Sequence, residues 1–93
     1  MFFQISYAYD KNFENKIIKD FKFIGLNNED LYKFNIKNLK TRIGSLFNQE
    51  NLLEDINNIY LTGYFEKVKP QIKPFKTGVL IEINVKKNPA INE

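Results

Sequence analysis

The chain has 93 residues, of which 43% are hydrophobic and 15% aromatic. This length and composition suit one folded domain with a single core and exclude a core with a separate catalytic domain. With no histidine, no cysteine, one arginine and a net charge of +3 on scattered lysines, it lacks the usual catalytic bases and nucleophiles and the clustered basic patch of a nucleic-acid-binding protein.

Apolar residues alternate with polar or small ones over residues 3–9, which is the period of a half-buried strand. This strand is either an extra one at the edge of the domain's sheet or the last strand of a preceding repeat. Residues 10–16 are polar and indicate a turn. We therefore expect residues 1–16 to form an N-terminal extension or extra strand, followed by a single domain over residues 17–93.

The next strand is predicted over residues 17–26, and the run that begins at Gly25 is expected to end it. Ile17, Phe21 and Phe23 share a parity with Gly25. We expect this face of the strand to meet the helices.

A first helix is predicted to begin at Glu29, because Asn28 can cap it and acidic residues suit the positive end of a helix dipole. Three apolar residues fit one face of this helix: Leu31, Phe34 and Leu39. The run from Leu31 to Ile36 also fits a strand, so both interpretations stay open here.

The second helix is the most clearly marked element. Asn48 is expected to cap it, with Glu50 in its first turn. Apolar residues then recur at helical spacing: Leu52, Leu53, Ile56, Ile59 and Tyr60. The stripe stops at Gly63, which can take the left-handed conformation that ends a helix.

A second strand is predicted over Phe65–Ile72, with Val68 and Ile72 pointing inward. Pro70 lies in the middle of this strand. Because proline cannot donate a ladder hydrogen bond, the strand is expected at the edge of its sheet. Residues 74–78 are expected to turn the chain into a last strand over residues 79–86, with its odd-numbered side chains apolar.

The junction Ile59-Tyr60-Leu61-Thr62-Gly63-Tyr64-Phe65 resembles the signature of the polypeptide-transport-associated (POTRA) domain. Gly25 at the end of the first strand, Gly44 four residues before Asn48, and Pro89 after the last strand also look like that family. The resemblance covers roughly residues 17–91. Lys87 departs from it, because the family commonly has an acidic residue there.

The resemblance implies an α+β fold with two layers in the order β-α-α-β-β. It implies a three-stranded mixed sheet of order 1-3-2 with both helices on one face. The residues that carry the structural motif are Gly25, Gly44, Tyr60, Gly63, Tyr64 and Phe65.

No catalytic, cofactor-binding or metal-binding residues are predicted. Glu54 and Asp55 are neighbours on the second helix and point about 100° apart, so we expect a solvated face or a cap there. Phe21 and Phe23 beside lysines faintly resemble an aromatic platform for RNA, but a core strand with solvated lysines explains them and no nucleic-acid partner is expected.

An exposed edge strand has unpaired backbone donors and acceptors, to which an extended polypeptide can add as a further strand. The residues expected to form such a peptide-binding edge are Glu66, Lys67, Val68, Lys69, Gln71 and Ile72. The lysines either protect the edge against self-association or steer a client. Pro70 removes one donor.

The resemblance implies a module on the water side of an outer membrane, in the bacterial periplasm or the intermembrane space of plastids or mitochondria. Its expected partners are unfolded precursor or outer-membrane protein polypeptides, neighbouring POTRA repeats and a C-terminal membrane β-barrel outside this sequence. No run of 18 apolar residues is present, so the fragment itself is expected to be soluble. The alternatives are a spacer or docking repeat that binds accessory subunits, and the related domain of a cell-division membrane protein.

Overall fold

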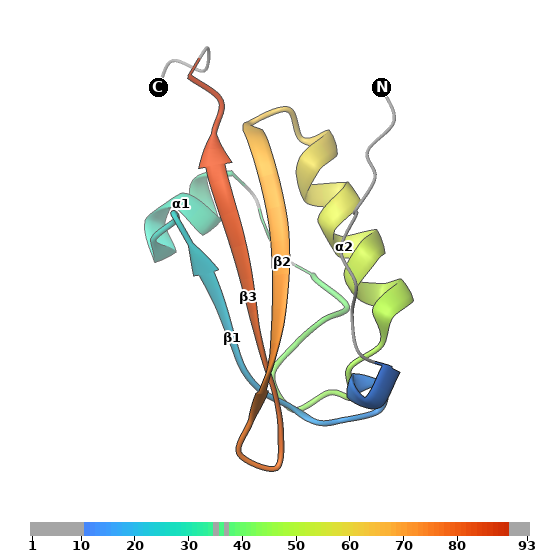
Figure 1. The fold of residues 1–93 in the computed structure, drawn as a ribbon. Coiled ribbons are helices and arrows are strands. Elements are labelled where there is room, and N and C mark those ends of the chain that lie inside the picture. Colours follow the sequence, from blue (N-terminus) through green and yellow to red (C-terminus); the bar gives the residue numbers. More distant parts are fainter. Residues whose placement is uncertain (1–10, 35, 37, 90–93) are drawn as a thin grey trace.

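The computed structural model describes residues 11–34, 36 and 38–89 and shows a sheet with helices packed on it (Figure 1). In chain order the elements are η1 (Lys11–Phe13), β1 (Ile18–Ile24), α1 (Asn28–Lys33), α2 (Gln49–Leu61), β2 (Phe65–Phe75) and β3 (Gly78–Lys87). After the short 3-10 helix η1 this is the predicted β-α-α-β-β order, and the α+β class is confirmed. The strand predicted over residues 3–9 lies outside the described residues.

The three strands form a mixed sheet in the order β1-β3-β2, as predicted. β1 is parallel to β3, and β2 is antiparallel to it. β2 therefore lies at an edge of the sheet, as predicted from Pro70. The strand continues to Phe75, so the predicted end at Ile72 and the assignment of Pro74 to a turn were wrong.

The core lies between the sheet and the helices. The odd-numbered residues of β3 are buried: Val79, Ile81, Ile83 and Val85. They share one core with the apolar face of α2 and with Phe34, which follows α1. α2 therefore covers one face of the sheet and Phe34 joins the same core, whereas no other described element packs on the opposite face, which has Glu82 and Asn84 at its centre.

A β-bulge in β1 changes which of its residues face the core. Ile18 pairs with Val79 and Asp20 with Leu80, so Lys19 is an extra residue in β1. Ile18 is 1% exposed and Ile17 is 43% exposed. The prediction that Ile17 faces the helices was therefore wrong, because the extra residue reverses the alternation ahead of it. Phe21 and Phe23, beyond the bulge, pack against the core.

Residues 44–47 pair with the start of β1, which the sequence analysis did not predict. Gly44 N donates to Ile18 O at 2.8 Å, and Ile18 N donates to Ser45 O at 2.9 Å. Phe47 N donates to Lys16 O at 2.7 Å, and the Phe47 ring is fully buried. This short segment covers the outer edge of β1 at its beginning.

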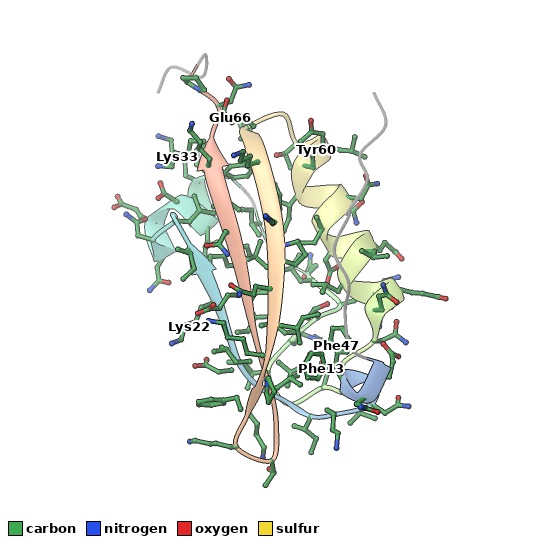
Figure 2. All side chains as sticks on the ribbon, viewed as in Figure 1. Phe13, Lys22, Lys33, Phe47, Tyr60 and Glu66 are labelled. Atoms are coloured by element: carbon green, nitrogen blue, oxygen red, sulfur yellow. The ribbon has the colours of Figure 1, made fainter. Side chains whose placement is uncertain are left out.

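The residues before β1 also attach to the domain. Phe13 packs against the core, which contains Phe47 (Figure 2 labels both), and Glu14 Oε1 accepts a hydrogen bond from Gln49 N at 2.7 Å. The latter contact lies at the start of α2. Side-chain contacts thus attach Phe13 to the core and Glu14 to the start of α2.

The first helix is shorter than predicted and is capped by Asn27, not by Asn28. Asn27 Oδ1 accepts from Asp30 N at 2.7 Å, and Asn27 N donates to Asp30 Oδ2 at 3.1 Å, which is a capping box. The helix ends at Lys33, and Ile36 N donates to Leu31 O at 2.9 Å beyond it. Leu39 is therefore not on this helix, and the alternative of a strand from Leu31 was wrong as well.

The second helix begins where the sequence predicted it. Asn48 Oδ1 accepts from Asn51 N at 2.9 Å, and the helix ends at Leu61. Gly63 follows with a φ of 84°, in the left-handed region that favours glycine.

Asp55 is a structural residue, and the prediction of a solvated face or a cap was wrong for it. It is 3% exposed, and its carboxylate accepts hydrogen bonds from Lys40 N at 3.0 Å and Thr41 N at 2.7 Å. Neighbouring Glu54 is exposed and pairs with Lys40 Nζ at 2.6 Å. Asp55 therefore fastens the connection between the helices onto α2.

Replacing Asp55 by asparagine should destabilise the fold by about 1.5–3 kcal/mol, because the hydrogen bonds that its buried carboxylate accepts from two backbone N–H groups are lost or weakened. Glu54→Gln is the matched control and should change the free energy of unfolding by less than about 1 kcal/mol, since that ion pair is exposed. Urea unfolding curves measure both. Equal midpoints for the two variants would contradict the role given to Asp55.

Two glycines with positive φ should respond differently to alanine. Gly63 has open space where a Cβ would lie, so Gly63→Ala should cost only backbone strain, about 1 kcal/mol. Gly25 has a φ of 101°, and a Cβ there would also overlap the carbonyl oxygen of Val85. Thermal or denaturant unfolding should therefore rank Gly25→Ala as clearly less stable than Gly63→Ala, and the reverse order would be evidence against this packing.

Asp30 should contribute to stability in a pH-dependent way. Its backbone hydrogen bond to Asn27, followed by its 3.0 Å bond to Lys87 Nζ, holds the pKa of this carboxyl below its ordinary value of 3.8. Because the folded pKa is the lower one, the stabilisation is present above pH 3.8 and is lost as the pH falls through the folded pKa.

Asp30→Asn should therefore be less stable than the parent near neutral pH, and the difference between their free energies of unfolding should shrink on acidification. Denaturant unfolding across an acid pH series measures this. Glu29→Gln, at the neighbouring exposed position in the same turn, is the control. A difference between parent and Asp30→Asn that stays constant with pH would contradict the assignment.

Candidate functional site: the outer edge of β2

The pairing of β2 with the central strand β3 determines which backbone groups of β2 point away from the sheet. Val79 N donates to Ile17 O at 2.9 Å, so Val79 directs its N–H toward the β1 side and not toward β2. In an antiparallel pair, alternate residues exchange both hydrogen bonds with their partner, and the residues between them direct their groups away. Val79 pairs with Pro74, so Pro74 and every second residue before it direct their backbone groups outward.

The outer edge of β2 is formed by four residues that share this parity: Val68, Pro70, Ile72 and Pro74. Both prolines of the strand are therefore at outward positions, where no hydrogen bond to β3 is lost. This explains how an 11-residue strand accommodates two prolines. All four residues have outward carbonyl oxygens, but only Val68 and Ile72 have an outward N–H.

The side chains of β2 divide between the two faces of the sheet. Val68 and Pro70 are buried and Ile72 is half-buried, on the face that packs against α2. The intervening residues are exposed on the open face: Lys67, Lys69, Gln71 and Lys73. A strand added to this edge would thus place alternate side chains beside α2 and beside the lysines.

Some charges of β2 are already paired. Glu66, at the start of the strand (Figure 2), contacts Lys86 Nζ at 2.8 Å and raises the pKa of that ammonium. Lys73 Nζ contacts Glu82 Oε1 at 3.1 Å. Within residues 11–34, 36 and 38–89, Lys67 and Lys69 have no ion pair, so their charges stay available to a partner.

The structure brings the predicted edge residues Glu66, Lys67, Val68, Lys69, Gln71 and Ile72 together on one strand. Val68 and Ile72 carry the outward backbone groups, whereas Lys69 and Gln71 bond to β3 and offer only side chains. The sequence analysis missed Pro74 as an edge residue. Its spacing of four from Pro70 gives it the same parity, which was the available signal.

The motif residues do not form one site. Tyr64 and Phe65 surround Phe34, with ring centroids 4.7 and 5.3 Å away, at the junction of α2 and β2 near Tyr60. Gly25 lies against Val85 and Gly44 lies beside Ile18, elsewhere in the fold. These residues shape turns and packing.

Phe21 and Phe23 do not lie on the open face of the sheet. They line a shallow cavity of about 400 Å³ together with residues of the α1–α2 connection, among them Leu39, Thr41 and Ile43. Bases stack on aromatic rings that an open sheet presents. The covered position of these two rings therefore does not fit an RNA platform.

Comparisons with known proteins agree with this fold. The POTRA family model, described as a surface antigen variable number repeat, matches residues 16–88. The outer membrane protein assembly factor BamA of Buchnera aphidicola is 33% identical over 92 residues, which are 99% of this chain and 14% of that protein. The chain thus spans a small part of its relative's length.

Solved structures show the same architecture. The N-terminal domain of Omp85 from Thermosynechococcus elongatus superposes with a TM-score of 0.68 at 28% identity, over 81% of this chain and 32% of that one. POTRA domains 1 and 2 of the periplasmic domain of Omp85 from Anabaena give a TM-score of 0.67 at 25% identity, over 80% and 48%. Because the family model matches residues 16–88, which are most of its length, this chain belongs to the POTRA family.

Proposed function

We propose that this POTRA domain takes part in outer-membrane protein assembly by receiving or holding unfolded client polypeptides, which add as a strand to the outer edge of β2. It acts on the water side of an outer membrane, beside further POTRA repeats and ahead of a membrane β-barrel. The relatives named as BamA and Omp85 support the assembly role. The edge itself supports the mode of binding.

The observation that carries the proposal is the unpaired backbone of β2. In the described part of the chain β2 pairs only with β3, which leaves outward carbonyls at four positions and outward N–H groups at Val68 and Ile72. Backbone groups are common to all polypeptides, so pairing with them suits a receptor of many clients. Weak selectivity for sequence is the expected result.

Charge adds a preference to this edge. Lys67 and Lys69 lie on the open face and have no ion pair among the described residues. An acidic client side chain opposite either lysine would gain about 0.2–1 kcal/mol. Binding should therefore weaken with salt, but only modestly, because the backbone bonds remain.

In this role the domain binds polypeptides and catalyses no bond chemistry. Within residues 11–34, 36 and 38–89 no group of three carboxylates gathers to hold a metal ion. None of the helices in these ranges is long and apolar enough to cross a membrane.

We also propose that the domain begins before residue 17, because Phe13 and Glu14 contact its core and α2.

The test is an NMR titration of this domain with a proline-free peptide from a strand of an outer-membrane β-barrel protein. The amides of Val68 and Ile72 should shift most, because their N–H groups point outward. The amides of Lys69 and Gln71 should shift less, because they bond to β3.

Ile72→Pro should abolish one of the two outward donors and lower the peptide affinity by about 2- to 12-fold. Ile72→Ala is the matched control, because it removes the same side chain but keeps the N–H. The stability of both variants is checked by thermal unfolding. A peptide that binds without shifting β2 amides, or a domain that binds only an accessory subunit, would favour a spacer or docking repeat instead.

A further inference from the structure

We infer that Pro70 and Pro74 determine which strand the edge of β2 accepts: they admit a proline-free client and disfavour a second copy of this chain. The inference rests on the proposed function, since it assumes that β2 pairs with an extended polypeptide. It assigns a role in partner choice to two residues whose positions on the strand are fixed by the pairing with β3.

Consider a client strand that runs antiparallel to β2 and pairs with its outward residues from 68 to 74. Each such pair can form two hydrogen bonds, one in each direction. Val68 and Ile72 form both, whereas Pro70 and Pro74 accept one and donate none. A proline-free client therefore forms six of the eight hydrogen bonds.

A second copy of the chain lacks the same donors. When two β2 strands align antiparallel over residues 68–74, Val68 meets Pro74 of the other copy and Pro70 meets Ile72. Each of the four pairs then contains one proline and forms one hydrogen bond, so four of eight remain. A register that places Pro70 opposite Pro74 is worse, because that pair forms none.

Lys69 and Lys73 also disfavour pairing between two copies of this chain. In the aligned pair of copies, Lys69 lies directly opposite Lys73 of the other copy on the open face, and like charges opposite each other are destabilising. A client can place an acidic or neutral residue at the same position. Backbone and charge therefore both favour a client over self-pairing.

Pro70 and Pro74 lie at positions where a proline changes only the outer edge of β2. A proline at an inward-bonding position such as Lys69 or Gln71 would break the ladder to β3, whereas prolines at Pro70 and Pro74 affect only the outer edge. The fold keeps its own sheet intact while the edge becomes rich in acceptors and poor in donors.

The experiment compares the parent with Pro70→Val, Pro74→Val and the double variant. Each substitution restores one outward N–H, so the affinity for the proline-free strand peptide should rise about 2- to 12-fold per site. The double variant should also self-associate at concentrations where the parent is monomeric, as measured by sedimentation velocity. Gln71→Val is the matched control, because it adds a strand-favouring side chain without an outward donor.

The inference is overturned if the double variant binds the peptide like the parent and stays monomeric while the peptide still shifts the amides of Val68 and Ile72. If neither the parent nor the double variant binds the peptide at β2, the proposed client binding fails. Sedimentation then still decides whether the prolines prevent self-pairing. Unfolding curves of each variant confirm that it is folded.

Discussion

The pairing register of the central strand is the constraint on which the rest of the structure depends. In a strand, both the direction of the backbone groups and the face of the side chain alternate with a period of two. The odd-numbered residues of β3, from Val79 to Val85, therefore direct their backbone toward β1 and their side chains into the core. A slip of one residue would expose the core and reverse both edges.

The same alternation separates two kinds of recognition on β2. Residues with outward backbone groups, such as Val68 and Ile72, have their side chains on the helix-covered face. Lys67 and Lys69, which have no ion pair among the described residues, use their backbone to pair with β3. Charge and backbone pairing thus reside on different residues, so a lysine can be exchanged without altering the backbone groups that a client strand would use.

Features with a local chemical cause could be predicted from sequence, and features that depend on distant contacts could not. Asn48, Gly63 and Pro70 each impose a local backbone requirement, and the second helix and the edge strand followed from them. The bulge at Lys19 has no local signal, because it arises from how β1 meets β3. Asp55 follows Leu52 by one helical turn, on the buried side, but its partners lie fourteen and fifteen residues away in a loop whose path the sequence does not give.

The two edges of the sheet are protected by different means, and the difference bears on function. The beginning of β1 is covered by the backbone of residues 44–47, which satisfies its donors and acceptors and leaves no room there for another strand. β2 is instead limited by prolines, which remove two donors but leave the outward carbonyls and the outward N–H groups of Val68 and Ile72 without a strand partner among the described residues. Covering an edge excludes every partner, whereas removing some donors only lowers affinity. The covered beginning of β1 is therefore closed to a further strand, whereas the edge of β2 has no strand partner among the described residues.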